Sequence, residues 1–355
     1  MSGTQESLQA APASQRYIKC VVWDLDNTLW NGVLLEGDAV VLRQQVRGII
    51  EALDSRGILQ SIASKNDNTR GMAKLKECGL HEYFVYPQIN WNSKASSIEK
   101  IAELINIGID SIAFIDDDPY EREEVSYSLP QVLCIDGAEI DDLLDIPEMN
   151  PRFLTEDSRD RRLIYIRDIE RNGAEQEFIG PKEEFLATLG MVLEIGPARE
   201  EDLKRAEELT VRTHQLNSTG YTYSYDDLNR YRTSGRHKLL IAGLDDKYGS
   251  YGKIGLALIE CSETAWTLKL LLMSCRVMSR GVGTILINTI MDEAKAHAVL
   301  LRAEFVPTDR NRIMYITYKF AGFQEVAKSG NLVILENDLS RSQPRPEYVR
   351  VRFVG

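Results

Sequence analysis

Residues 21–30 read Val21-Val22-Trp23-Asp24-Leu25-Asp26-Asn27-Thr28-Leu29-Trp30. The apolar start predicts a buried strand, and the strand ends in the pattern Asp-x-Asp-x-Thr. Two carboxylates at one strand end form a strongly negative pocket that suits Mg²⁺, which takes oxygen ligands and keeps positions open for phosphate. In such a pocket Asp24 can attack phosphorus, and Asp26 can act as general acid and then general base. A simple acidic turn would look the same, so further motifs are needed.

Three further polar motifs follow in order along the chain. Ser64 ends the apolar stretch 57–63, and its hydroxyl can hydrogen-bond a phosphoryl oxygen. Lys94 precedes a helical pattern, where it can pair with the nucleophile and with phosphate. A third predicted strand, 111–115, ends in Asp116-Asp117-Asp118-Pro119, whose acids would complete a Mg²⁺ shell.

With these four motifs, residues 17–136 resemble the haloacid-dehalogenase (HAD) phosphatase superfamily. The resemblance implies a Rossmann-like parallel sheet, with Asp24 as the phosphoryl nucleophile and Asp26 as its acid and base. The implied phosphate-binding residues are Thr28, Ser64 and Lys94. The implied Mg²⁺ ligands are Asp24, Asp116, Asp117 and the backbone carbonyl of Asp26. The intervals between motifs have room only for a short flap and single helices, so we expect a capless, open site.

Length, charge and cysteine content limit the class of protein. A chain of 355 residues is longer than a usual single domain, so two cores are expected. The formal net charge of −12 argues against nonspecific nucleic-acid binding, and no apolar run is long enough to cross a membrane. The five cysteines show no CxxC pairing, and residues 1–15 lack the apolar core of a signal peptide. These features predict a reduced, cytoplasmic protein.

The predicted boundaries follow changes in composition. An acidic segment and the turn signal Asn150-Pro151 close the first domain, and a densely charged helical segment follows. We expect a disordered tail at 1–16, the phosphatase domain at 17–148, a linker helix region at 149–184, a second domain at 185–340 and a basic tail at 341–355.

The second half has a different pattern. A predicted helix over 200–212 is followed by strands at 238–243, 254–261, 265–274, 300–306 and 332–335. The loop Arg280-Gly281-Val282-Gly283 opens a further helix, whose free backbone N–H groups suit a phosphate. Near the end stands Tyr318-Lys319-Phe320-Ala321-Gly322-Phe323. This order resembles the GNAT acyltransferase fold, which implies an α+β domain. Met278 stands where GNAT enzymes usually have Arg or Gln, which counts against ordinary acetyl-CoA use.

Cys275 is the candidate nucleophile of the second half. It follows a strand directly before Arg276 and the glycine loop, and thiolates near Arg and a helix N-terminus are the reactive form. A small apolar residue at a strand end would look the same. His214, in Arg212-Thr213-His214-Gln215-Leu216-Asn217, is either a base for Cys275 or a solvated loop histidine.

The two-domain order, with Asp-Leu-Asp-Asn-Thr-Leu-Trp and Ser274-Cys275-Arg276-Val277, resembles the FkbH-like glyceryl transferase/phosphatases of polyketide pathways over nearly the whole chain. The resemblance implies that Cys275 accepts the acyl group of 1,3-bisphosphoglycerate and that the remaining phosphate is removed. Glyceryl then passes to the phosphopantetheine thiol of an acyl carrier protein. The residues expected to contact substrate are Arg212, Gln215, Asn217, Arg276, Arg280, Gly281, Gly283, Thr308 and Asn311.

Two other interpretations stay open. One is a phosphatase fused to an acetyl-CoA-dependent N-acetyltransferase, and the other is a phosphatase whose second half only docks a carrier protein. Because carrier proteins are usually acidic, docking needs a local basic surface on this acidic chain. The basic tail is the first candidate, with a loosely ordered tail as the alternative. Its arginines are Arg341, Arg345, Arg350 and Arg352.

Overall fold

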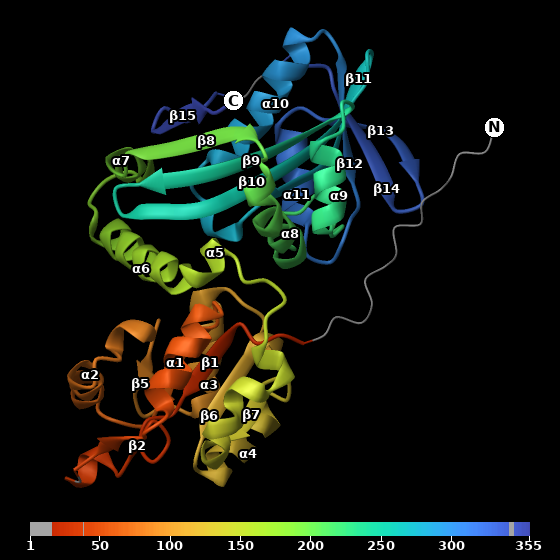
Figure 1. The fold of residues 1–355 in the computed structure, drawn as a ribbon. Coiled ribbons are helices and arrows are strands. Elements are labelled where there is room, and N and C mark those ends of the chain that lie inside the picture. The colour runs from red at the N-terminus through yellow and green to blue at the C-terminus, as the bar shows by residue number, and fades with distance from the viewer. Residues whose placement is uncertain (1–15, 38, 341–343) are drawn as a thin grey trace. The chain divides into compact units, whose positions relative to one another are not determined.

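The computed structural model describes residues 16–37, 39–340 and 344–355 (Figure 1). The chain divides into two compact units, residues 1–168 and 169–355. Each unit has its own hydrophobic core. The expected tail at 1–16 lies outside the described residues except for Arg16, whose Nε donates a hydrogen bond to the backbone carbonyl of Asp110. Arg341 of the expected basic tail also lies outside them.

The first unit is built on a five-stranded parallel sheet in the order β5-β4-β1-β6-β7. Its strands are β1 (Cys20–Trp23), β4 (Leu59–Ser64), β5 (Gln88–Ile89), β6 (Ile112–Asp116) and β7 (Leu133–Asp136). The helices between them are α1 (Val46–Ser55), α2 (Asn68–Glu77), α3 (Lys94–Ile105) and α4 (Pro119–Ser128). Parallel strands need such crossover helices, and both faces of the sheet are therefore covered.

Short elements complete this unit. A flap of two short strands, β2 (Trp30–Asn31) and β3 (Val41–Leu42), follows β1 and encloses the turn η1 (Leu34–Glu36). Further single turns are η2 (His81–Tyr83), η3 (Ile109–Ser111), η4 (Gly137–Asp145) and η5 (Pro147–Met149). The flap is the only insertion between β1 and α1, so the first unit carries no cap domain within its described residues.

Three helices follow the first sheet: α5 (Glu156–Arg159), α6 (Arg161–Glu177) and α7 (Lys182–Thr188). The start of α6 contacts the first unit, where Arg161 donates a hydrogen bond to the carbonyl of Gly57. Gly57 has a φ of +68°, and a Cβ there would lie 2.4 Å from the carbonyl oxygen of Ser158. Only glycine fits this turn without moving α5.

The second unit has an eight-stranded mixed sheet in the order β13-β14-β12-β11-β10-β9-β8-β15. The strands are β8 (Met191–Pro197), β9 (His237–Asp246), β10 (Gly249–Cys261), β11 (Ala265–Met273), β12 (Leu300–Phe305), β13 (Gln324–Ser329), β14 (Leu332–Asn337) and β15 (Val349–Phe353). Its helices and turns are η6 (Glu200–Asp202), α8 (Leu203–Arg212), α9 (Tyr225–Arg232), η7 (Cys275–Val277), α10 (Val282–Ala296) and α11 (Arg312–Phe320). Two pairs are parallel, β11 with β12 and β15 with β8.

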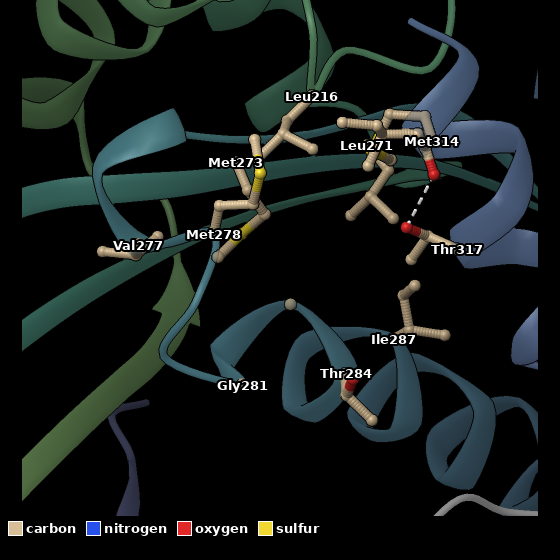
Figure 2. Close-up of a pocket in the computed structure, with 12 residues that line it drawn as sticks. Leu216, Leu271, Met273, Val277, Met278, Gly281, Thr284, Ile287, Met314 and Thr317 are labelled. Carbon is tan, nitrogen blue, oxygen red and sulfur yellow. Dashed lines mark hydrogen bonds between the residues drawn. The ribbon is translucent and has the colours of Figure 1, made fainter. Parts of the chain in front are cut away.

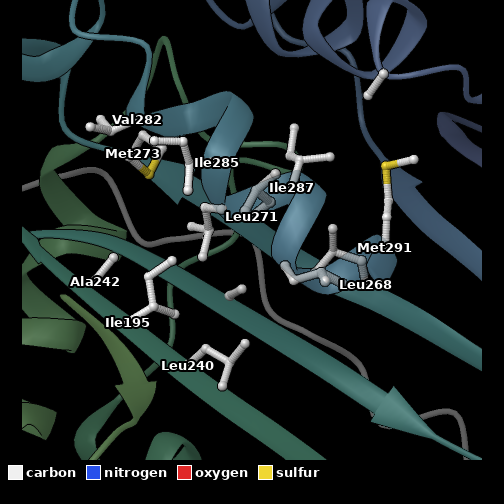
Figure 3. Close-up of a cluster of buried hydrophobic side chains, with 14 of the residues drawn as sticks. Ile195, Leu240, Ala242, Leu268, Leu271, Met273, Val282, Ile285, Ile287 and Met291 are labelled. Carbon is white, nitrogen blue, oxygen red and sulfur yellow. The ribbon is translucent and has the colours of Figure 1, made fainter. Parts of the chain in front are cut away.

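The helices of this unit bury apolar side chains on both faces of the sheet. One core contains Val282, Ile285 and Ile287 of α10 together with Leu271 and Met273 of β11 (Figure 3). A second core joins α8 and α9 to the other face of the same strands.

The parallel strands β11 and β12 part before they end. Their paired register stops at Leu268 and Ala303. Beyond that point the segment 216–218 pairs with β11 instead: the N–H of Ser218 donates to the carbonyl of Leu271, and the N–H of Met273 donates to the carbonyl of Leu216. The loop after α8 is therefore fixed at the end of β11, where Cys275 follows.

This topology confirms the predicted fold class: a Rossmann-like parallel-sheet domain, without a cap among its described residues, is followed by an α+β domain with a mixed sheet. The segment expected as a basic tail contains β15, which extends the second sheet next to β8. Arg352 of β15 pairs with Glu194, and Arg345 pairs with Asp292. Among the described residues, no helix has the length and apolar character that crossing a membrane requires.

A buried ion pair anchors α6 to the second unit and gives the first prediction. Arg171 and Asp246 are both fully buried, with 2.7 Å between Nε and Oδ2, and the hydroxyl of Tyr251 also donates to Asp246. Arg171→Met should lower the free energy of unfolding of this domain by about 3–5 kcal/mol, because it leaves a buried carboxylate without its cation. Chemical denaturation followed by circular dichroism measures the loss. Asn172→Ala, at the exposed neighbouring position, is the control. Equal stability of the two variants would contradict the prediction.

Candidate active site

Three carboxylates meet at the carboxyl edge of the first sheet. Strands β1 and β6 are parallel neighbours, with Trp23 opposite Ile115, so the residues that follow these two come together. Asp24, Asp116 and Asp117 each offer a carboxylate oxygen, and these oxygens all lie within 4.8 Å of one another. Asp24 and Asp116 are buried, whereas Asp117 is exposed. The cluster therefore has one open side.

Lys94 is the cation of this cluster. It is the first residue of α3, whose start is fixed by Ser93, since the Ser93 hydroxyl accepts a hydrogen bond from the N–H of Ser96. The buried ammonium group of Lys94 pairs with Asp24 and lies 3.0 Å from Oδ2 of Asp116. One cation thus faces three carboxylates within the described part of the chain.

Burial dominates the acid–base properties of the cluster. It raises the pKa of Asp24 to about 7, although Lys94 and a hydrogen bond with Ser64 act in the opposite direction. It also raises the pKa of Asp116, again against the effect of Lys94. Burial disfavours the charge on Lys94 as well, but the two carboxylates outweigh it and raise the pKa of that lysine. The two acids are thus short of positive charge.

Asp26 is held away from the cluster by three hydrogen bonds. Its Oδ1 accepts from the indole Nε1 of Trp30 at 2.7 Å and from the N–H of Leu34 at 3.2 Å. Its Oδ2 accepts from Nδ2 of Asn66 at 2.8 Å. A carboxylate oriented in this way suits an acid–base role beside the metal pocket. The motif pattern indicates no role for Trp30 or Asn66, which contact Asp26 from the flap and from the loop after β4.

Thr28 connects the two strand ends. Its hydroxyl donates to Oδ1 of Asp117 and accepts from the N–H of the same residue, at 3.1 and 2.9 Å. In this structure the predicted phosphate-binding Thr28 therefore orients Asp117. All seven site residues expected in the first domain gather at one edge of the sheet: Asp24, Asp26, Thr28, Ser64, Lys94, Asp116 and Asp117.

Cys275 begins the turn η7 that follows β11, and its thiol is half-buried. The residues around it in sequence, Met273, Val277 and Met278, line an apolar cavity of about 150 Å³. Residues of α10 and α11 complete the lining (Figure 2). Burial raises the pKa of the thiols of the other cysteines, Cys20, Cys78, Cys134 and Cys261, and so makes them poor nucleophiles.

Three of the residues expected to contact substrate form one hydrogen-bond network, and their contact with substrate stays a prediction. Nδ2 of Asn311 donates to the backbone carbonyls of Asn217 and Val306, at 3.0 and 2.9 Å. Oδ1 of Asn217 accepts from the N–H of Gly220, and the Thr308 hydroxyl accepts from the N–H of Asn311. The network ties the loop after α8 to the loop after β12. His214 and Gln215 lie exposed on the first of these loops.

The three arginines expected to contact substrate have protein partners. Arg276 donates from Nε to the hydroxyl of Ser274 at 3.3 Å, and Arg212 pairs with Glu208 at 3.2 Å. Arg280 is almost completely buried and lies 3.1 Å from Glu175 of α6.

The glycine loop opens α10 as predicted. Gly281 precedes the helix with a φ of +74°. A Cβ at Gly281 would lie 2.8 Å from the hydroxyl oxygen of Tyr348, so a side chain there would displace the C-terminal segment. Gly281 and Gly283 both line the cavity, and the expected approach of a ligand to this loop remains a prediction.

No protein-family model matches the chain, and no curated protein matches its sequence. A similar solved structure is the N-terminal part of BF1531 from Bacteroides fragilis, which contains a phosphatase domain complexed with Mg. It is 27% identical, with a TM-score of 0.30, and the match covers 42% of this chain and 39% of that one. The ribosomal-protein-S18-alanine N-acetyltransferase of Escherichia coli is 17% identical, with a TM-score of 0.34 and coverage of 42% and 96%. The PaiA N-acetyltransferase of Thermoplasma acidophilum, in complex with coenzyme A, is 17% identical, with a TM-score of 0.33 and coverage of 41% and 98%.

The raised pKa of Asp24 gives a pH prediction for the protein in chelator. A carboxyl group with a folded-state pKa near 7 and an unfolded one near 4 favours the folded state at low pH, and this contribution is lost as the pH rises through 7. Between pH 5 and 7 the free energy of unfolding of the first domain should fall by up to about 1.4 kcal/mol per pH unit for this group. Three of the four tryptophans, Trp23, Trp30 and Trp91, lie in this domain and Trp266 lies in the other, so Trp266→Phe is used as the background for the fluorescence measurement. Asp24→Asn should flatten the dependence of the free energy of unfolding on pH, whereas the exposed control Asp141→Asn should leave it unchanged. If Asp24→Asn and the wild type show the same pH dependence, the raised pKa does not belong to Asp24.

Proposed function

We propose that the first domain is a Mg²⁺-dependent phosphatase. The observation that carries this proposal is the cluster of three carboxylates around one buried lysine. The cluster has more negative than positive charge, and its free ligand atoms are all oxygens. Such a donor set fits Mg²⁺. Asp24, Asp116 and Asp117 would hold the ion, together with the backbone carbonyl of Asp26. When bound, Mg²⁺ neutralises phosphoryl oxygens, so that an anionic nucleophile can approach phosphorus.

Side chains of the first domain carry out nucleophilic attack, phosphate binding and proton transfer. Asp24 attacks phosphorus and forms an aspartyl phosphate, while Lys94 and Ser64 hold the phosphoryl oxygens. Asp26 gives a proton to the leaving oxygen and then takes one from the water that hydrolyses the aspartyl phosphate. Its hydrogen bonds from Trp30, Leu34 and Asn66 keep the carboxyl group in one orientation during both transfers.

We further propose that the second domain is the glyceryl transferase of the FkbH-like family. The thiolate of Cys275 attacks the C1 carbonyl carbon of 1,3-bisphosphoglycerate, a thioester forms and inorganic phosphate leaves. The first domain then hydrolyses the phosphate at C3. The phosphopantetheine thiol of an acyl carrier protein displaces Cys275 and takes the glyceryl group into polyketide biosynthesis. The position of Cys275 between β11 and the glycine loop, beside an apolar cavity, supports this role.

The thiol assignment is tested by intact-protein mass spectrometry after incubation with 1,3-bisphosphoglycerate and Mg²⁺. The wild-type chain should gain a hydroxylamine-labile glyceryl mass, and Cys275→Ala should gain none, because it lacks the acyl acceptor. Cys261→Ala is the matched control and should load normally, since burial raises the pKa of that thiol. Labile loading of the Cys275→Ala protein would show that another group accepts the acyl unit.

The order of the two steps is tested with Asp24→Asn. This variant keeps the thiol but lacks the phosphoryl nucleophile, so it should accumulate a phosphoglyceryl thioester, heavier than the glyceryl form by one phosphoryl group. Chelation of Mg²⁺ should produce the same species in the wild-type protein. Asp141→Asn, at an exposed site, should behave as wild type. If Asp24→Asn yields dephosphorylated glyceryl-enzyme at the wild-type rate, Asp24 is not the nucleophile.

A further inference from the structure

We infer that the exposed face of α11, next to the mouth of the cavity, is the surface on which an acidic carrier domain docks. This inference rests on the proposed transfer step and identifies the part of the protein that would receive the partner. It places the partner at α11 rather than at the basic C-terminal segment that the sequence favoured.

The opening of the cavity can be located from two residues that both line it and reach solvent. Met278, after η7, is 45% exposed, and Ile313, in the first turn of α11, is 40% exposed. Met314 and Thr317 of the same helix point into the cavity (Figure 2). The cavity is lined by Met273 and Val277, which stand two residues before and two residues after Cys275, although Cys275 is not itself a lining residue.

An apolar stripe continues from this opening along the outside of α11. Ile313, Ile316 and Phe320 follow one another at intervals of three and four residues, which puts them on one helix face. They are 40%, 40% and 74% exposed. Large apolar side chains that are grouped on a surface mark interaction sites more often than isolated ones do.

The positive charge around the apolar stripe favours an acidic partner. Residues 309–320 contain Arg310, Arg312 and Lys319 and a single acid, Asp309, which pairs with Arg310 at 3.7 Å; the segment is therefore positive in a chain with a net charge of −12. Arg312 is exposed and stands four residues before Ile316, on the same face as the stripe. An acidic partner is repelled by most of this chain and attracted here, where apolar contacts follow. A small acidic carrier domain has this chemistry.

The basic C-terminal segment is less available for docking. Arg345 pairs with Asp292 and Arg352 pairs with Glu194, so two of its cations already face protein carboxylates. Its strand β15 also lies at the edge of the sheet beyond β8, whereas α11 follows β12, the strand that runs parallel to β11. Both basic surfaces come near the cavity, since Tyr348 of the C-terminal segment lies against Gly281. However, α11 lines the cavity itself, with Ile313, Met314 and Thr317, and the C-terminal segment contributes no lining residue.

The test uses the full-length protein, a phosphopantetheine-loaded acidic acyl carrier protein, and free pantetheine as a small thiol without a protein surface. The docking variants are Arg310→Glu with Arg312→Glu, and Phe320→Glu alone. The matched control reverses two arginines elsewhere, Arg350→Glu with Arg352→Glu. Carrier binding is measured directly by titration, and glyceryl transfer is measured from the pre-loaded enzyme. Circular dichroism verifies that each variant is folded.

Both docking variants should weaken carrier binding and slow transfer to the carrier by about tenfold or more at low salt. Transfer to free pantetheine and self-loading of Cys275 should stay at the wild-type level, and so should every activity of the control. Reversal of Arg310 and Arg312 should also reduce the salt dependence of carrier binding.

Several results would overturn the inference. Unchanged carrier binding in the docking variants, or weakened binding in the control alone, would place the partner elsewhere. Equal loss of transfer to carrier and to pantetheine would show that α11 only shapes the cavity. If ultracentrifugation finds a wild-type dimer that Phe320→Glu dissociates, the stripe is a self-association surface. Failure of Cys275 to load would refute the proposed function separately, since carrier binding needs no turnover.

Discussion

The parallel pairing of β1 with β6 is the constraint on which the first domain depends. It brings Asp24 and Asp116 together in a buried place, where two like charges are costly without a cation. Lys94, at the start of α3, supplies one positive charge, and burial raises the pKa of both acids against the effect of that lysine. The proposed Mg²⁺ would relieve the same crowding of negative charge. The burial of Asp24 and Asp116 thus affects both the stability of the first domain and its proposed chemistry.

Much of the first domain could be predicted because its signals are local. Each motif combines a short apolar strand with the polar residue that ends it, so residue type and position appear in the same few residues. The partners of Asp26 were less visible. Trp30 lies four residues away, across a flap turn, and Asn66 comes from the end of another strand, so neither contact can be read from spacing alone.

The second domain was harder to predict where contacts join distant segments. Arg280 was expected to contact substrate, and the sequence gives no sign that it also pairs with Glu175, which lies 105 residues earlier on α6. Asn217 and Asn311, 94 residues apart, join two loops through a backbone hydrogen bond. Strand β15 was missed because its alternating arginines look like a solvated tail. The segment is a strand because its backbone pairs with β8, a contact between residues that are far apart in the sequence.

The position of β15 also affects how this protein behaves in concentrated solution. An open sheet edge invites strands of other molecules, and natural proteins discourage this with charged side chains on the outermost strand. Here Arg350 and Arg352 alternate with Val349 and Val351, so the two arginines share one face of the outermost strand, where they are exposed, and Arg352 also pairs with Glu194 of β8. Repulsion between two such edges opposes sheet-to-sheet aggregation, a protection that a chain ending before Val349 would lack.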